Sequence, residues 1–221
     1  MSNHKKAIII SGGMLEDEFV LSVMKANPES YIIGVDRGAS FLYKYQIMPD
    51  YIVGDFDSLS EEIIHYYRTE TKVPIREFNP IKDASDTEVA LRLALSIGSK
   101  EILILGATGN RIDHLWANVQ ILMIAHKVGV TAWILDMHNR IHLIDGETHL
   151  KKEEAFGQYF SVFPLGEKVE DFDIRGAKYP LYSHVLEPCN SLCVSNEILQ
   201  EEAVITFARG IVILMETRDH I

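Results

Sequence analysis

Two carboxylates stand two residues apart directly after an apolar run in this sequence. The segment 54–58 reads Gly-Asp-Phe-Asp-Ser and follows Tyr-Ile-Val at 51–53. Side chains at positions i and i+2 of an extended chain point to the same side, so Asp55 and Asp57 can converge on one point. Oxygen-only ligation suits Mg²⁺, which proteins usually hold with one or two carboxylates plus substrate phosphates. The segment therefore predicts a divalent-cation site.

The same segment has a second interpretation as the start of a helix. Ser58 and Glu61 match the spacing of a capping box, in which a serine and a glutamate satisfy the first amides of a helix. Acidic residues near a helix N-terminus are favoured by the helix dipole, so a single aspartate there needs no functional explanation. Two aspartates on the strand side of the cap are harder to explain in this way. The segment alone leaves both interpretations open.

Further acidic residues recur where strands are expected to end. In a parallel sheet, the ligand crevice lies outside the carboxyl ends of the strands. Besides Asp55 and Asp57, the residues expected at this edge are Asp36, Asp83, Asp86 and Asp113. Surface turns are rich in aspartate, so roughly one or two of these six are expected to be structural. The others predict an acidic site.

The loop 106–111, which reads Gly-Ala-Thr-Gly-Asn-Arg, enters an expected helix. Glycines such as Gly109 let backbone N–H groups approach a phosphate at the positive end of a helix. The loop matches neither the Walker P-loop nor the dinucleotide-binding fingerprint. Arg111 adds a donor suited to bidentate phosphate contact, next to Asp113.

Two further basic residues are candidates with structural alternatives. His114 is suited to orient a carboxylate or to contact a phosphate, and equally to be a partly buried structural histidine. Lys82, just before Asp83, is a second phosphate candidate or a solvated loop lysine. Carboxylates for Mg²⁺, an arginine and a glycine loop, without a nucleophilic triad, indicate phosphoryl-type transfer. The spacing does not identify the acceptor, nor does it separate transfer to an alcohol from hydrolysis.

The first part of the chain alternates Ile- and Val-rich runs with segments of helical period. This pattern is typical of βα units around a mainly parallel sheet. Ser85 and Glu88 form a capping box that fixes the start of one helix, and Gly98 is placed to end it. The expected strands are 6–11, 31–35, 51–53, 73–78, 101–105 and 130–135, and the clearest helices are 87–97 and 115–127. We therefore expect residues 1–136 to form a Rossmann-like α/β domain with flanking helices.

After Asp136 the helical period fades and short β-like runs follow one another between turn residues. The pattern predicts a hairpin over 140–150, a strand over 158–163 and a closing hairpin of 204–207 with 211–215. We therefore expect residues 137–221 to form a smaller C-terminal β-sandwich domain.

Composition excludes several classes of protein. The 221 residues are 47% hydrophobic, which is enough for an ordinary core, and the formal net charge is −11. Such a balance disfavours binding to nucleic-acid backbones or to anionic membranes. No run reaches the roughly 18 apolar residues of a membrane span. With only two cysteines, Cys189 and Cys193, free thiols in a reducing cytoplasm are expected.

Taken together and in order, these motifs resemble the thiamine pyrophosphokinase family. The segments that carry the resemblance are 35–39, 49–58, 82–88 with 90–91, 106–114 with Asn118, 176–181 and 194–197. The resemblance covers nearly the whole chain. It implies transfer of the terminal diphosphate of ATP to the hydroxyl of thiamine, which gives thiamine diphosphate and AMP.

The resemblance also implies roles for single residues. It implies that Mg²⁺ is held on the ATP phosphates by Asp55, Asp57 and Asp86, and that Asp36 and Asp113 complete the acidic catalytic group. It implies that five further residues bind ATP or its phosphates, namely Lys82, Asp83, Gly109, Arg111 and His114. It implies that Ser195 and Asn196 hydrogen-bond the pyrimidine of thiamine from the β-rich domain. The family is homodimeric with sites at the subunit interface, which implies the same assembly here.

This chain departs from the family pattern at three positions. Ser85 stands where threonine is usual, Asn110 where glycine is common, and Cys193 where some members have serine. The β-rich part also lacks tryptophan, so an aromatic wall against thiamine there must come from tyrosine, phenylalanine or histidine. Two alternatives remain, namely a diphosphokinase for another heterocyclic alcohol such as a pterin, and a non-catalytic sensor of thiamine or nucleotide. A sensor is expected to have lost the carboxylates, and all six are present.

Overall fold

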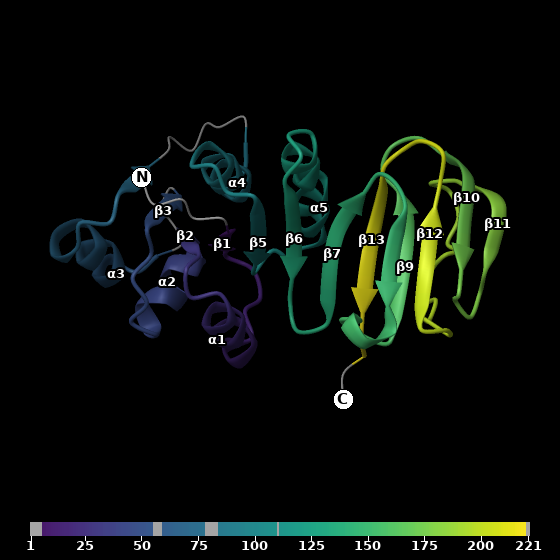
Figure 1. The fold of residues 1–221 in the computed structure, drawn as a ribbon. Coiled ribbons are helices and arrows are strands. Elements are labelled where there is room, and N and C mark those ends of the chain that lie inside the picture. The colour runs from purple at the N-terminus through teal and green to yellow at the C-terminus, as the bar shows by residue number, and fades with distance from the viewer. Residues whose placement is uncertain (1–5, 55–58, 78–83, 110, 220–221) are drawn as a thin grey trace. The chain divides into compact units, whose positions relative to one another are not determined.

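The computed structural model describes residues 6–54, 59–77, 84–109 and 111–219. The chain divides into two compact units, Met1–Met137 and His138–Ile221. The first combines helices with a parallel sheet, and the second consists mainly of antiparallel strands (Figure 1).

The first unit contains a parallel sheet with the strand order β4-β3-β2-β1-β5-β6. Its strands are β1 (Lys6–Ile10), β2 (Tyr31–Val35), β3 (Tyr51–Gly54), β4 (Ile75–Glu77), β5 (Glu101–Leu105) and β6 (Thr131–Leu135). From β1 the chain adds β2 to β4 on one side and β5 and β6 on the other. The direction of winding therefore reverses between β1 and β5.

Helices cover both faces of this sheet (Figure 1). They are α1 (Asp17–Ala26), α2 (Arg37–Lys44), α3 (Glu61–His65), α4 (Asp86–Ser96) and α5 (Ile112–His126), with a π-helical turn, η1 (Tyr66–Glu70), after α3. Ile8 and Ile10 of β1 pack with residues of α1 and α2. Because Ile9 is also fully buried, the strand is apolar on both faces, as a central parallel strand requires.

Two of the helix starts test the predicted capping boxes. The hydroxyl oxygen of Ser85 accepts a hydrogen bond from the Glu88 N–H at 3.3 Å, which confirms the predicted cap of α4. The predicted cap at Ser58 is wrong, because α3 begins at Glu61 and Ser60 caps it by accepting from the N–H of Ile63. An N-cap side chain accepts a hydrogen bond from the N–H two or three residues ahead, so a helix that begins at Glu61 is capped by Ser60.

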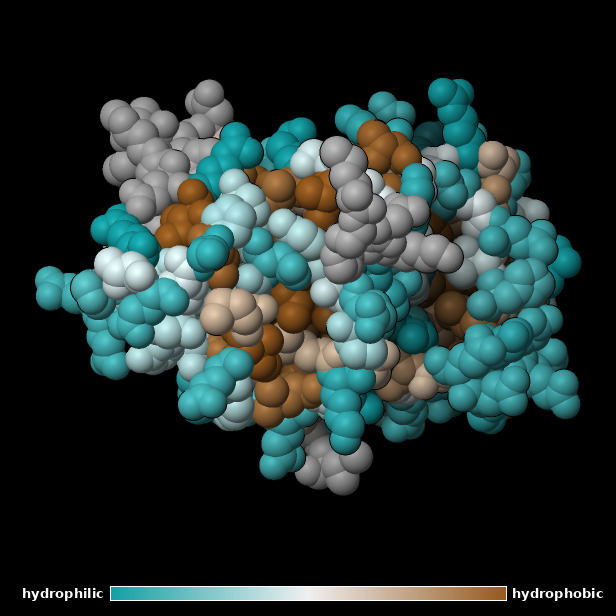
Figure 2. Space-filling model, turned by 60° about the vertical axis from the view of Figure 1, so that its left-hand side comes forward, coloured by the Kyte–Doolittle hydropathy of each residue, from teal (hydrophilic) through white to brown (hydrophobic). Residues whose placement is uncertain are grey.

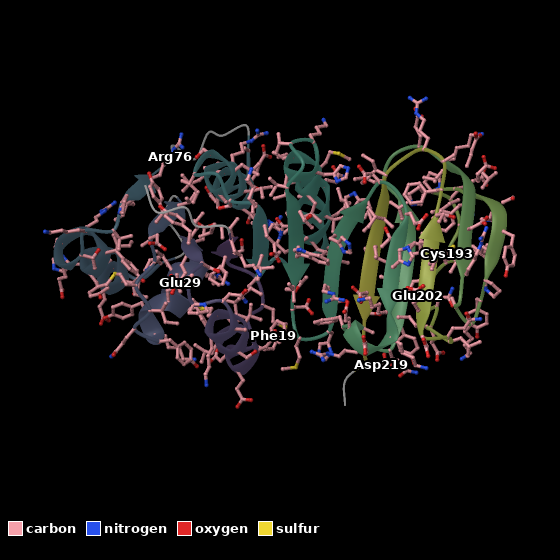
Figure 3. All side chains as sticks on the ribbon, in the orientation of Figure 1. Phe19, Glu29, Arg76, Cys193, Glu202 and Asp219 are labelled. Atoms are coloured by element: carbon pink, nitrogen blue, oxygen red, sulfur yellow. The ribbon has the colours of Figure 1, made fainter. Side chains whose placement is uncertain are left out.

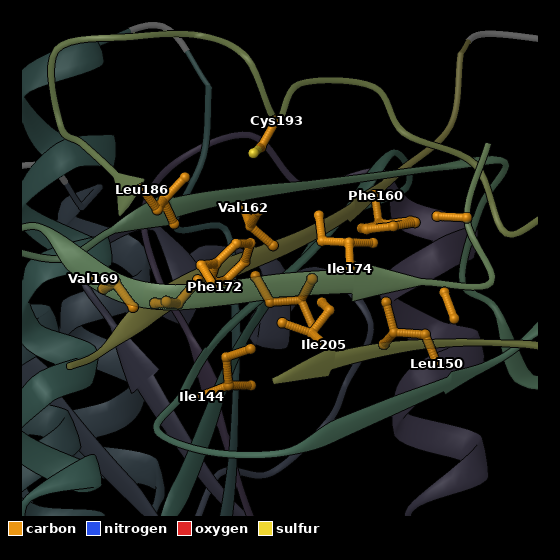
Figure 4. Packing of buried hydrophobic residues seen from close by; sticks show 14 residues of the cluster. Ile144, Leu150, Phe160, Val162, Val169, Phe172, Ile174, Leu186, Cys193 and Ile205 are labelled. Atoms are coloured by element: carbon orange, nitrogen blue, oxygen red, sulfur yellow. The ribbon is translucent and has the colours of Figure 1, made fainter. Parts of the chain in front are cut away.

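The second unit has two groups of antiparallel strands. β7 (Asn139–Ile144), β13 (Val212–Thr217) and β9 (Tyr159–Pro164) pair in that order. The other group has the order β11-β10-β12-β8, made of β8 (Thr148–Lys151), β10 (Val169–Arg175), β11 (Leu181–Leu186) and β12 (Glu202–Thr206), with a 3₁₀ turn, η2 (Lys152–Glu154), after β8. Phe160 and Leu214 of the first group share one buried cluster with Phe172 and Ile205 of the second (Figure 4). The two groups thus pack as a sandwich.

Both predicted hairpins of the second unit are wrong. β7 pairs with β13 and β8 with β12, and the last two strands, β12 and β13, also belong to different groups. Ile144 and Leu150, on either side of the first turn, both point into the shared core, as do Ile205 and Val212 at the second. Each turn therefore crosses from one layer to the other, and the inner faces of the two layers together form the core.

The predicted fold class, a mainly parallel α/β sheet followed by an antiparallel β domain, is confirmed. On the face shown in Figure 2, hydrophilic residues surround smaller hydrophobic areas. Within the described ranges, no helix has the length and apolar character that crossing a membrane requires.

Candidate functional site

The loops after β1 and β5 meet where the winding of the sheet reverses. The N–H of Ser11 donates to the Leu105 carbonyl at 2.8 Å, and the N–H of Gly13 to the Gly106 carbonyl at 2.8 Å. The N–H of Met14 continues this pairing to the Thr108 carbonyl at 2.9 Å. In open α/β sheets, ligands bind outside the carboxyl ends of the strands at such a reversal. These two loops are therefore the centre of the candidate site.

Glycine is required at several points of this contact. A Cβ atom at Gly13 would overlap the carbonyls of Gly106 and Thr108. Gly109 has φ +123, and a Cβ there would lie 2.9 Å from the Met14 nitrogen. Both close approach and backbone conformation therefore exclude side chains at these positions.

Asp36 follows β2 and opens α2 with an unusual backbone, φ 48 and ψ −121. Its side chain lies against Gly54, the last residue of β3, because a Cβ at Gly54 would overlap Asp36 Oδ1. Gly54 has φ +151, and the Asp36 N–H donates to the Val53 carbonyl at 3.2 Å. A non-glycine residue in this conformation persists only where its surroundings impose it, and such residues cluster at functional sites.

The start of α4 is tied to the end of β1. The hydroxyl groups of Ser11 and Thr87 are 2.8 Å apart and form a hydrogen bond, and Ser11 is buried. Asp86, the first residue of α4, is the neighbour of Thr87. The Ser11–Thr87 bond thus fixes Asp86 near the carboxyl end of β1.

Arg111 and Asp113 form a two-pronged ion pair at the start of α5. Arg111 Nε donates to Asp113 Oδ1 at 3.1 Å, and Nη2 donates to Oδ2 at 2.5 Å. The hydrogen bonds from Arg111 hold the pKa of Asp113 below its usual value, and the His114 N–H adds a bond at 2.9 Å. Both side chains are largely exposed, at 70% and 64%, so water screens the pair. The guanidinium remains accessible to an incoming phosphate.

Ser195 and Asn196 lie in the second unit and differ in environment. Asn196 is buried, and its Oδ1 accepts from the N–H groups of Tyr179 at 3.0 Å and Glu197 at 2.9 Å. Its Nδ2 donates to the Tyr179 carbonyl at 2.8 Å. An amide has two acceptor sites and two N–H donors, so the bonds formed among the described residues use both acceptor sites and one of the N–H groups. Exposed Ser195 has φ 56, and its N–H donates to Ser161 Oγ at 3.0 Å.

The segment that Asn196 holds presents an aromatic side chain. Tyr179 is 58% exposed, and the Lys178 ammonium lies 5.6 Å from its ring centroid. Cys193, in contrast, is buried at the edge of the core of the second unit (Figures 3 and 4). Burial raises the pKa of its thiol to about 11, so this cysteine is a neutral packing group.

Four predicted site residues, Asp55, Asp57, Lys82 and Asp83, lie outside the described residues. Among the residues that are described, no group of three or more His, Cys, Asp or Glu side chains could hold a metal ion. The structure does bring Asp36 to the end of β3, Asp86 to the end of β1, and Gly109 to the loop after β1.

Three residues of this edge were missed by reasoning from the sequence. Gly13 and Met14 hold the glycine loop through their backbone, and Asp136 accepts a hydrogen bond from Thr108 at 2.7 Å. The glycine pair at 12–13, one residue after an apolar run, was a usable signal for a close backbone approach. Asp136 follows β6 just as the other candidate aspartates follow their strands, so its position was a usable signal too.

The fold and the loops at the strand reversal together define an α/β protein with a candidate site at the carboxyl edge of its parallel sheet, followed by an antiparallel β domain. The family model described as "Thiamin pyrophosphokinase, catalytic domain" matches residues 24–134, and "Thiamin pyrophosphokinase, vitamin B1 binding domain" matches residues 147–212. The chain belongs to the thiamine pyrophosphokinase family.

Individual relatives agree with this assignment. The chain is 33% identical over 189 residues to thiamine pyrophosphokinase of Bacillus subtilis (strain 168), which covers 85% of this chain and 87% of the relative. The crystal structure of the thiamine pyrophosphokinase from Bacillus subtilis superposes with a TM-score of 0.85 at 28% identity, over 98% of this chain and 100% of that one. The structure from Geobacillus thermodenitrificans superposes with a TM-score of 0.82 at 29% identity, over 97% and 98%.

Proposed function

We propose that this chain transfers the diphosphate group of ATP to the hydroxyl of thiamine, forming thiamine diphosphate and AMP. Membership of the family across both units supports this activity. The structural observation that carries the proposal is the glycine loop 106–109, bonded to the loop after β1 at the reversal of the sheet. This loop leads directly into Arg111 and α5, which supply positive charge for a polyphosphate.

Mg²⁺ is the proposed cofactor, with Asp55, Asp57 and Asp86 as its ligands. The donor chemistry fits, because carboxylate oxygens are the side-chain ligands that Mg²⁺ prefers. The surroundings fit too. Gly54, the residue before Asp55, touches Asp36, and Asp86 is tied to the end of β1 through Thr87. When bound, the metal would neutralise charge on the ATP phosphates.

In the proposed reaction the thiamine hydroxyl gives up its proton to a general base, and its oxygen attacks the β-phosphorus of ATP. The bond from that phosphorus to the oxygen shared with the α-phosphate breaks, and AMP leaves with the electron pair. Arg111 neutralises charge on the phosphate oxygens, and Asp113 orients it through two hydrogen bonds. The hydrogen bonds from Arg111 lower the pKa of Asp113, which favours the charged carboxylate that accepts them.

The second unit is the proposed thiamine side. Ser195 and the remaining N–H of Asn196 are the proposed polar contacts, and Tyr179 is the exposed ring that the adjoining segment offers. We further propose a homodimer with active sites at the subunit interface, located in the cytoplasm. The unpaired state of Cys189 and Cys193 supports a reducing compartment.

Incubation with ATP, Mg²⁺ and thiamine tests the proposal, with AMP and thiamine diphosphate quantified by chromatography. We expect the two products in equal amounts. Turnover with a pterin alcohol but not with thiamine would reject the proposed substrate, and thiamine binding without AMP release would indicate a sensor. Asp57→Asn should keep the fold and remove activity, so unchanged turnover in that variant would reject the metal assignment.

A further inference from the structure

We propose that Thr108 and Asp136 form a positioning pair that holds the glycine loop 106–109 in its phosphate-binding shape. The inference rests on the proposed function, because it assigns these residues to the ATP side of that reaction. Thr108 Oγ1 donates to Asp136 Oδ2 at 2.7 Å, across 28 positions of the sequence. Asp136 directly follows β6 and is 7% exposed. The pair therefore connects the loop after β5 to the end of the next strand.

The carbonyl groups of the loop are held on both sides. The Gly106 and Thr108 carbonyls accept from the N–H groups of Gly13 and Met14. Between them, the Ala107 carbonyl accepts from Nδ2 of Asn118 on α5 at 2.8 Å. Asn118 is itself buried, so this bond is shielded from water. Three successive peptide groups of the loop are thus fixed.

Fixed carbonyls determine where the amides point. In a trans peptide, the C=O of one residue and the N–H of the next point in opposite directions. The N–H groups of Ala107 and Gly109 therefore point away from the Gly13–Met14 segment. Ala107 is buried, whereas Gly109 is exposed, so Gly109 presents its amide to the outside. The exposed N–H of Gly109, two residues before Arg111, is suited to donate to a phosphate oxygen.

Thr108 precedes this amide, and its side chain supplies a fourth hydrogen bond that holds the loop. A hydrogen bond to a buried carboxylate is stronger than one between neutral groups and restricts the rotation of the threonine. With its proton donated to Asp136, the hydroxyl of Thr108 does not donate to a phosphate. Thr108 therefore acts through the peptide that it shares with Gly109, which makes it a positioning residue.

Removal of the hydroxyl by Thr108→Val tests the pair. The free energy of a hydrogen bond to a charged group corresponds to a change of about 10- to 100-fold in an equilibrium constant. We expect kcat/KM for ATP to fall by about that factor, with KM for ATP rising and KM for thiamine changing less than about twofold. Thr108→Ser, which keeps the hydroxyl, should restore most of the loss. Thr71→Val is the matched control. Thr71 is not part of the loop 106–109, and its Oγ1 donates a hydrogen bond of 2.9 Å to the Tyr67 carbonyl.

The partner residue gives a second, independent variant. Asp136→Asn keeps an oxygen acceptor but removes the charge, so its loss should be smaller than that of Thr108→Val. In the double variant the losses should not add, because either change breaks the same bond. Additive losses in the double variant would overturn the proposed pair. So would equal increases in both KM values together with a lower melting temperature, because Thr108 would then have only a general structural role.

Equilibrium binding of Mg-ATP by calorimetry separates this inference from the proposed function. If the wild type binds ATP without forming AMP, the proposed function fails, and a weakened affinity in Thr108→Val would still support the pair. If the wild type turns over thiamine and Thr108→Val is unimpaired, the proposed Thr108–Asp136 pair is rejected and the proposed function stands. If the wild type neither binds ATP nor forms AMP, both are rejected.

Discussion

The side chain of Asp36 rests on the backbone of Gly54, so the ends of β2 and β3 are in contact where the acidic edge begins. A Cβ atom at Gly54 would overlap Asp36 Oδ1, and the backbone of Gly54 has φ +151. Asp36 itself has a positive φ of 48. Each residue therefore fixes the other's conformation, directly before Asp55.

Gly54→Ala should displace Asp36 and strain the backbone. We expect a loss of about 1–3 kcal/mol in the free energy of unfolding and at least a tenfold decrease in kcat, measured by urea denaturation and by AMP release. Gly98→Ala is the matched control, because Gly98 also has a positive φ, +89, but no atom within 4 Å of an added Cβ. If both variants lost kcat equally, the contact with Asp36 would have no part in activity.

Asn196→Ala should loosen the segment that carries Tyr179. The change removes three hydrogen bonds and leaves the N–H and C=O of Tyr179 without their partner. We expect a loss of about 2–4 kcal/mol in stability and a larger rise in KM for thiamine than for ATP. Asn190→Ala serves as the control, since exposed Asn190 bonds only the nearby N–H of Leu192 among the described contacts. Equal effects on both KM values would argue against a place for Asn196 on the thiamine side.

His142 should make the fold less stable in acid. Burial, with a smaller contribution from the charge of Arg140, lowers the pKa of His142 to about 4. Between the unfolded pKa of about 6.5 and pH 4, the unfolded chain binds a proton that the folded chain does not, so stability falls as the pH falls. The difference amounts to about 3 kcal/mol at most.

His142→Gln should remove this part of the pH dependence, as measured by urea denaturation at pH 7, 6, 5 and about 4. His149→Gln is the control, because the hydrogen bonds that the His149 ring donates to Glu147 and Glu202 raise the pKa of that exposed histidine. Its contribution has the opposite sign, present at low pH and lost as the pH rises. An unchanged acid slope in His142→Gln would mean that other groups cause it.

Elements with a strong local signal were predictable from the sequence. The bounds predicted for 31–35 and 101–105 are those of β2 and β5, because continuous apolar runs there stop at polar residues or glycine. The cap at Ser85 was predictable for the same reason, since a cap depends on residues only three positions apart. The loop 106–109 was recognisable from its glycines.

Features that depend on distant residues were not predictable. The turns after β7 and β12 look like hairpin turns, and only the packing of Ile144 against the opposite layer shows that they join different layers. Asp136 meets Thr108 because β5 and β6 are neighbours in the sheet, which no local pattern encodes. Likewise, the family resemblance implied Asn196 as a ligand of thiamine, but not that most of its amide is committed to Tyr179.

The place of β13 has a consequence for biosynthesis. This strand lies between β7 and β9, with Met215 opposite both Ile141 and Ser161. β7 and β9 leave the ribosome well before β13 does. Their hydrogen bonds to β13 therefore cannot form until it has emerged. The first unit, whose strands are all made earlier, is free to fold during that interval. A nonsense codon ahead of β13 would therefore release a chain with a folded α/β unit and exposed, unpaired β-strands, a substrate for proteases and chaperones.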